Sequence, residues 1–221
     1  MPVIRSVNVG RPKDVDWAAL GYTSIDKRPV DGPVKAHRNG LVGDVVSDTK
    51  HHGGPDQAVY AFAREDLDLW AERLGREIRD GQFGENLTTE GIDVNEAVVG
   101  EQWQVGTAVL EVAYVRIPCN DFKNWMGVTG YDAEQWVKRF MAECRPGPYL
   151  RVRQEGVLAA GDEILLLERP AHGVTVSTMF RALNLEPALL PELLRIDDLV
   201  PQARVKAARF AEALPPSRAN V

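Results

Sequence analysis

The sequence predicts a mainly β protein with some α-helix: a mixed barrel or sandwich with capping helices, followed by a small three-helix extension. Over residues 1–170, short runs of alternating apolar and polar residues are separated by glycine-containing turns, with only two or three helical patches between them. After residue 170 the pattern changes to leucine-rich runs of helical period, interrupted by prolines. We therefore place a domain boundary there, with the barrel at 1–170 and the extension at 171–221.

Each element of the first part is predicted from its own periodicity. The segments with the alternation of strands are Val3–Val9, Ser24–Pro29, Ala58–Ala63, Gln102–Val105, Ala108–Ile117, Tyr149–Gln154 and Glu163–Glu168. In Arg64–Leu74 and Ala133–Glu143, apolar residues recur at helical spacing, so both predict helices. We expect these two helices to cap the barrel.

Three short helices are predicted in the extension, at Val176–Asn184, Pro187–Arg195 and Pro201–Leu214. Pro187 and Pro201 suit first-turn positions, where a helix needs no N–H donor. Helices this short are not stable alone in water, so we expect them to pack on one another or on the barrel. The polar, proline-led tail at 215–221 is expected to fray.

Composition narrows the functional classes. The chain has 221 residues, a net charge of −6 and a pI near 5.3. It also has no basic stripe, so a general affinity for the nucleic-acid backbone is not expected. Its two cysteines, Cys119 and Cys144, require no disulfide framework and are typical of free thiols in a reducing compartment. The chain starts without a targeting segment and has no run of 18 apolar residues, so we expect a cytoplasmic protein that does not enter a membrane.

The first chemical motif joins GLVGD, at 40–44, to HHGGPDQAVYAF, at 51–62. Gly53 and Gly54 form a tight turn with Pro55 that can aim backbone N–H groups at an anion, although a plain turn is also possible. This turn lacks the residues of a P-loop and of a dinucleotide-binding fingerprint. His51 and His52 are adjacent, so at most one of them faces a site on an extended backbone.

The second and third motifs are FGENLT, at 83–88, and RIPC, at 116–119. Glu85 and Asn86 could contact a ring that carries donors and acceptors, and Glu85 could instead cap a nearby backbone. Cys119 follows a strand that ends at Pro118, where the strand becomes loop or helix, and Arg116 favours its thiolate. A thiolate suits a soft metal, whereas the alternative is a small buried apolar residue. Neither cysteine has the partner spacing of a zinc site.

Taken in order, the motifs GLVGD, HGGPDQAVYAF, FGENL, RIPC, GPYLRV and GDEILLL resemble the MOSC family, named after the C-terminal domain of molybdenum cofactor sulfurases. They are most similar to its stand-alone, YiiM-like branch. The resemblance covers most of residues 1–170 and implies a MOSC-type β-barrel followed by a three-helix extension.

The resemblance also implies a site for the molybdenum cofactor, a molybdenum–pterin. Cys119 corresponds to the cysteine taken to coordinate molybdenum beside the pterin dithiolene, and His52 matches the family histidine. The residues implied in binding the pterin or its terminal phosphate are His52, Gly53, Gly54, Asp56, Glu85, Asn86, Arg116 and Arg151. Either arginine could instead be a salt-bridge partner on the barrel rim.

For function, the resemblance implies an oxidoreductase that reduces small N-hydroxylated compounds, including toxic base analogues, and so acts in detoxification. The sequence has no iron–sulfur cysteine cluster and no flavin fingerprint, so a separate reductase must supply electrons. The alternative is a sulfur carrier or cofactor-delivery protein with a persulfide on Cys119. The substrate, pterin form, electron donor and oligomeric state stay open.

Overall fold

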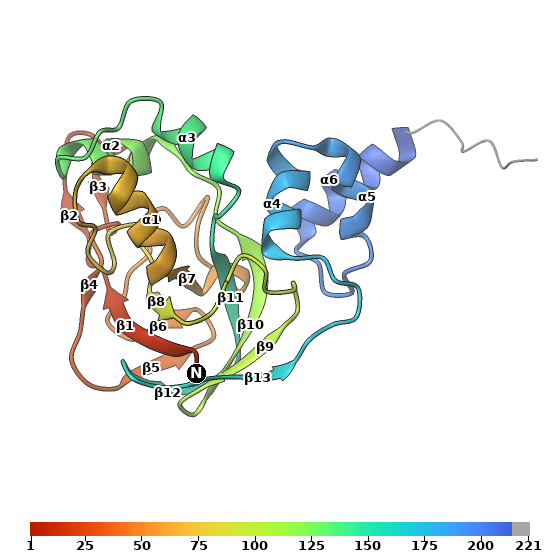
Figure 1. The fold of residues 1–221 in the computed structure, drawn as a ribbon, viewed down its shortest axis with the longest axis horizontal. Helices are drawn as coiled ribbons and strands as arrows, with labels where there is room; N and C mark the ends of the chain where they lie inside the picture. The colour runs from red at the N-terminus through yellow and green to blue at the C-terminus, as the bar shows by residue number, and fades with distance from the viewer. Residues whose placement is uncertain (214–221) are drawn as a thin grey trace, which may run out of the picture.

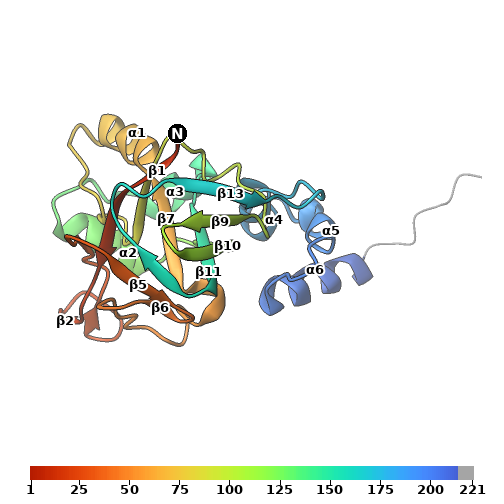
Figure 2. The ribbon, with the colours of Figure 1, turned by 90° about the horizontal axis from the view of Figure 1, so that it is seen from below.

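The computed structural model describes residues 1–213, which form a strongly curled sheet with helices at one end and at one side (Figures 1 and 2). The strands of the main sheet, in spatial order, are β13 (Ile164–Glu168), β9 (Gln102–Val105), β10 (Ala108–Val115), β11 (Pro148–Gln154), β7 (Val59–Ala63), β8 (Leu87–Glu90), β1 (Val3–Val9) and β4 (Arg28–Pro29). Val3 and Glu163 meet in one isolated antiparallel bridge, which brings the two sides of the curled sheet close together, but β1 and β13 do not pair as strands, so the barrel is not closed.

Two smaller sheets complete the β structure. A three-stranded sheet contains β12 (Gly156–Leu158), β5 (Val34–His37) and β6 (Gly40–Leu41), and a two-stranded sheet pairs β2 (Lys13–Asp14) with β3 (Tyr22–Thr23). The short 3-10 helix η1 (Pro55–Gln57) follows the glycine pair. β5 and β6 pair as a hairpin, with His37 opposite Gly40.

The helices fall into two groups (Figure 1). One group, α1 (Arg64–Leu74), α2 (Asn120–Val128) and α3 (Trp136–Glu143), covers one end of the barrel. The second group contains α4 (Val176–Asn184), η2 (Pro187–Leu189), α5 (Leu190–Leu193) and α6 (Pro201–Ala213). It lies beside the barrel, where α4 contacts β10. None of the helices in 1–213 combines the length and apolarity needed to cross a bilayer.

Most predicted elements form within two or three residues of the expected bounds, and the mainly β fold with a helical extension is confirmed. The prediction of a strand over Ser24–Pro29 was wrong except for Arg28–Pro29, because the chain bends there to bury Lys27 against Asp44. The strands β5, β6, β8 and β12 and the helix α2 were not predicted as elements. The proposed fraying tail at 215–221 lies outside the described residues, and the domain boundary at 170 stays a prediction.

One parallel strand pair brings two motifs together. β7 and β8 are parallel neighbours connected through α1, whereas all other neighbours in the main sheet are antiparallel. Parallel strands begin at the same edge, so the glycine turn before β7 and the FGEN loop before β8 lie side by side. The backbones also bond there, since the Asn86 N–H donates to the Tyr60 carbonyl at 2.8 Å.

An aromatic cluster packs the capping helices onto this end of the barrel. Its largest members, all at most 1% exposed, are Phe62, Trp70, Phe83, Phe122, Trp136 and Phe140. Ring centroids lie 4.8 to 6.5 Å apart in tilted, stacked and edge-to-face arrangements. Such pairs stabilise the fold beyond the area they bury, so the cluster holds α2 and α3 against the barrel.

A charge cluster joins the barrel to the second helical group. Arg151 and Arg153 on β11 both donate to the buried Glu111 carboxylate of β10, at 2.6 to 2.9 Å. Both also bond Asp198, in the loop between α5 and α6. Glu111 is 5% exposed in its side chain and Asp198 is 68% exposed, so the two carboxylates differ mainly in burial.

We expect the two carboxylates to contribute unequally to stability. Glu111→Gln should lower the free energy of unfolding by about 3 kcal/mol, because it leaves buried arginine charge poorly compensated. Asp198→Asn should cost at most about 1 kcal/mol, since water already screens this pair. Urea denaturation of both variants measures the difference, and equal losses would contradict the assignment.

Candidate functional site

A cavity of about 450 Å³ opens at the end of the barrel where the motifs meet. Among its lining residues are five that the sequence singled out: His52, Gly53, Asn86, Arg116 and Cys119. They come from the loop before η1, the loop before β8 and the segment that follows β10. Residues more than 60 positions apart along the chain thus share one wall.

Cys119 lies at the N-cap of α2, with an extended backbone and a half-buried side chain. No side-chain bond caps this helix, so its first N–H groups face the region of the thiol. The strand therefore gives way to a helix, and the first turn of that helix presents the Cys119 thiol at the cavity.

Arg116 is a buried cation, 6% exposed, that lines the same cavity. Its Nη1 donates to the Phe83 carbonyl at 2.8 Å, and its guanidinium lies 3.7 Å from the ring centroid of Phe122. Among the carboxylates of residues 1–213, none lies within ion-pair distance of it. Burial works to lower the pKa of Arg116, but Tyr60, Tyr149 and Cys119 outweigh burial and raise it. The cavity therefore presents a permanent positive charge that an anion could neutralise.

His52 and Tyr149 form a second polar pair on the cavity wall, with the tyrosine hydroxyl 3.5 Å from Nδ1 of His52. Burial, followed by the charge of Arg116, lowers the pKa of His52, so the ring is neutral at pH 7. Burial raises the pKa of Tyr149 to about 12, so its hydroxyl keeps its proton. Tyr149 is the third residue of the GPYLRV motif, but its hydroxyl gave no local sequence signal of a role in the site.

Asp44 is the polar centre of this region. Its carboxylate accepts from the Gly10 N–H at 2.7 Å, from Asn86 Nδ2 at 2.9 Å and from the buried Lys27 ammonium at 2.5 Å. Burial lowers the pKa of Lys27, and the charge of Asp44 opposes that shift. Asn86 also accepts from the Tyr60 N–H at 3.1 Å, so its amide is largely engaged in holding the wall together.

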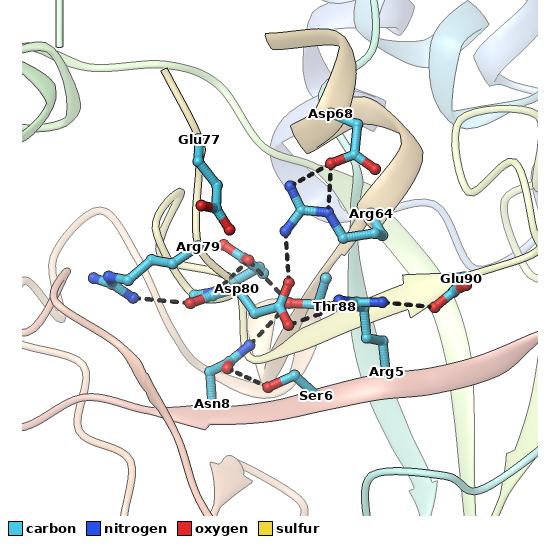
Figure 3. Close-up of polar contacts among 12 residues, drawn as sticks. Arg5, Ser6, Asn8, Arg64, Asp68, Glu77, Arg79, Asp80, Thr88 and Glu90 are labelled. Atoms are coloured by element: carbon cyan, nitrogen blue, oxygen red, sulfur yellow. Dashed lines mark hydrogen bonds and ion pairs between the residues drawn. The ribbon is translucent and has the colours of Figure 1, made fainter. Parts of the chain in front are cut away.

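Glu85 lies behind the cavity and does not line it. Its carboxylate accepts from the Gly81 and Phe83 N–H groups, at 2.5 and 2.9 Å, and from the Thr88 hydroxyl at 3.0 Å. Figure 3 shows the adjoining network, in which Asn8 donates to Thr88 at 3.1 Å. The placement favours the backbone-capping alternative for Glu85. Burial raises the pKa of its carboxyl to about 7.

Three other predicted ligands also lie outside the cavity. Gly54 is the N-cap of η1, with φ at 77°, a conformation that favours glycine. Asp56 accepts from Arg151 Nε at 2.6 Å, and Arg151 is further engaged by Glu111 and Asp198. We expected Arg151 beside Arg116 in the cavity; it instead lines a separate cleft with Asp198. Its carboxylate partners come from β10, η1 and the α5–α6 loop, which local spacing does not indicate.

The chemistry of the cavity fits the implied cofactor. Besides the uncompensated Arg116, it contains Gln57, whose Oε1 is buried and has no hydrogen-bond partner within residues 1–213. A ligand that carries both negative charge and N–H donors, as a pterin phosphate does, would satisfy both groups. Among these residues no three His, Cys, Asp or Glu side chains form a metal-ligand set, so Cys119 is a single soft donor. A metal here would need further donors from its own organic ligand.

Comparisons with known proteins identify the relatives of this chain. The family profile described as "MOSC domain" matches residues 48–165. YflK of Bacillus subtilis is 32% identical over 174 residues, which are 78% of this chain and 76% of YflK. A protein of Gibberella moniliformis named "Reductase" is 31% identical over 200 residues, covering 86% of this chain but only 34% of that protein. The crystal structure of YiiM from Geobacillus stearothermophilus has a TM-score of 0.78 and 27% identity, covering 95% of this chain and 99% of that one.

The raised pKa of Glu85 predicts a specific pH dependence of stability. The folded-state pKa of about 7 exceeds the ordinary value of 4.5, so the folded protein holds the Glu85 proton more tightly than the unfolded chain does. The resulting contribution to the free energy of unfolding is fully present below pH 4.5 and is lost as the pH rises through 7. Relative to Glu85→Gln, the wild type should lose up to about 3 kcal/mol of unfolding free energy between pH 4.5 and 8. Urea titrations at four pH values test this. Glu90→Gln, on the exposed end of β8, should show no such difference, and a wild type that gains stability with pH relative to Glu85→Gln would refute the assignment.

The uncompensated charge of Arg116 predicts anion binding. Pyrophosphate should raise the melting temperature of the wild-type apoprotein, and a ligand present at ten times its Kd adds about 1.4 kcal/mol of stability. Arg116→Met should remove this response, because the methionine fills a similar volume without charge. The matched control, Arg38→Met, replaces an exposed arginine outside the cavity and should keep the response. Equal responses in all three proteins would show that Arg116 binds no anion.

Proposed function

The chain belongs to the MOSC domain family, whose members are associated with the molybdenum cofactor, and we propose that it is a molybdenum-cofactor-binding reductase of N-hydroxylated compounds. The observation that carries the proposal is the pairing, in one cavity, of a thiol at a helix N-terminus with a buried arginine that lacks a carboxylate partner. A soft ligand and an anion site are the two contacts that a metal–pterin phosphate requires.

The residues of the cavity divide into those that would hold the metal and those that would hold the organic part. Cys119 would ligate the metal through its thiolate. Arg116 would neutralise negative charge on the pterin or its phosphate, and the Gln57 carbonyl oxygen would accept from a ring N–H. Gly53, at φ 79°, lets the backbone approach closely, since a Cβ there would lie 3.3 Å from Val46.

The reaction breaks the N–O bond of the substrate. One R–NH–OH, two electrons and two protons give R–NH₂ and H₂O, so the nitrogen is reduced and the oxygen leaves as water. When bound, the cofactor supplies a metal that accepts oxygen and transfers two electrons. His52 and Tyr149 hold exchangeable protons at the cavity wall, where the protonated tyrosine hydroxyl lies 3.5 Å from Nδ1 of a neutral imidazole.

The electrons are proposed to come from a separate reduced electron-carrier protein that contains flavin or an iron–sulfur cluster. The name of the Gibberella relative supports reductase chemistry, although the chain spans about a third of that protein. The sequence supports a separate donor, since it lacks the cysteine spacing of an iron–sulfur site and the glycine fingerprint of a flavin fold.

Cys119→Ala should abolish metal loading and reduction together. Protein from a molybdenum-sufficient host is analysed for molybdenum and pterin and is assayed with reduced methyl viologen and an N-hydroxylated purine. We expect near-stoichiometric metal in the wild type. Metal content should fall at least about tenfold in Cys119→Ala, because losing one metal ligand costs more than about 1.4 kcal/mol of binding free energy. The control Cys144→Ala should load metal as the wild type does.

Two outcomes would contradict the proposal. Metal loading that survives in Cys119→Ala would remove the thiol from the site. Metal-free wild-type protein with cyanide-labile sulfur on Cys119 would instead support the sulfur-carrier alternative, because a helix N-terminus stabilises a persulfide anion as it does a thiolate.

A further inference from the structure

A second hollow, which we call the α2–α3 groove, lies directly beside the wall that carries Cys119. It has a volume of about 550 Å³ and is formed by α2, α3 and the end of α4. Trp136, Val137, Met141 and Leu185 make its apolar surface, and Lys123 and Lys138 supply its charge. Asn120, the residue after Cys119, lines both the groove and the cavity, so the first turn of α2 separates the two spaces.

The charge of the groove has one sign. Lys123 and Lys138 are both exposed, and neither forms an ion pair with a carboxylate of residues 1–213. No carboxylate of the described part of the chain lines the groove, although the chain as a whole carries a net charge of −6. This positive patch attracts an acidic partner, whereas the acidic remainder of the surface repels it. Binding at the patch is therefore selective and sensitive to salt.

The rim of the groove carries local backbone strain. Gln135 has φ 48°, a left-handed conformation uncommon for any residue except glycine. Strained backbone concentrates at functional sites, where a partner or a mechanism offsets its cost.

The floor of the groove is also packed directly against the cavity wall. The Trp136 ring is edge-on to Phe122 at 5.3 Å between centroids, and the Arg116 guanidinium lies 3.7 Å from the other ring's centroid. Trp136, Phe122 and Arg116 therefore form one contiguous contact chain from the groove to the proposed cofactor cavity. A redox group placed over the groove would be separated from the cavity by this one layer of side chains.

We propose that the α2–α3 groove is the docking site of the electron donor, an electron-carrier protein that presents an acidic patch around its redox group. This inference rests on the proposed function. The small size of the groove matches the transient, low-area encounters of redox partners, and the apolar floor with its two lysines supplies the short-range contact and the orientation.

The test separates docking from catalysis. Wild type, Lys123→Glu/Lys138→Glu and the control Lys35→Glu/Arg209→Glu are compared; all four side chains are exposed, and both double variants change the net charge by the same amount. Each protein is assayed with reduced methyl viologen and with a reduced acidic ferredoxin or flavodoxin, and binding of each carrier is measured by calorimetry at low and moderate salt.

We expect the groove variant to keep its viologen-driven rate within about twofold, while its KM and Kd for the carrier rise at least about tenfold, since rim charges act on association. The control should behave as wild type. The proposal is overturned if the groove variant and the wild type bind the carrier with equal affinity. It is also overturned if the wild type turns over with reduced viologen but binds neither carrier.

If viologen supports no turnover, the proposed function fails, and the binding data alone decide whether the groove is a docking site. A groove variant that loses self-association in sedimentation, with carrier binding unchanged, would assign the surface to a second copy.

Discussion

The carboxylate of Asp44 connects the segments around the cavity, and the rest of the site depends on it. It binds the backbone after β1 at Gly10, the buried ammonium of Lys27 and the amide of Asn86. Asn86 in turn holds the backbone of β7 at Tyr60. A buried carboxylate is tolerated only when such partners replace water. Removing it would strand Lys27 in the interior and would break three of the bonds that hold these segments together.

Against this satisfied network, the unsatisfied groups stand out. Arg116 keeps a buried charge without a carboxylate, and Gln57 keeps a buried oxygen without a donor, whereas Lys27, Arg151 and Glu85 are each fully engaged. Arg116 and Gln57 both lie on the wall of one cavity, whereas the other buried side-chain atoms without partners in residues 1–213, on Trp70, Thr89 and Trp136, are uncharged and lie outside it. A positive charge without a counterion and an acceptor without a donor, both in one cavity, are groups that a bound ligand can satisfy.

Helix α2 contacts both the cavity that contains Cys119 and the α2–α3 groove on the outside of the protein. Its N-terminus holds Cys119 toward the cavity, its buried face packs Phe122 and Trp125 into the aromatic cluster, and its exposed Lys123 faces the α2–α3 groove. Because the cluster fixes α2 against the barrel, the distance and orientation between the Cys119 thiol and the α2–α3 groove stay constant. The proposed substrate access and electron delivery would then use different sides of one rigid helix and would not compete for space.

The sequence by itself determined the strands with clear alternation, the helices α1 and α4, and the ordered motifs that identified Cys119, Arg116 and His52, because these signals depend on neighbours within a few residues. It did not determine which charged groups are engaged. Arg151 and Glu85 have the residue types of ligand contacts, but their partners, such as Asp198, lie far away along the chain or in an unpredicted turn. The role of Asp44, the parallel pairing of β7 with β8 and the proximity of the groove to the cavity were decided only by tertiary structure. Charge compensation depends on distances in space, and a linear pattern carries the residue types without those distances.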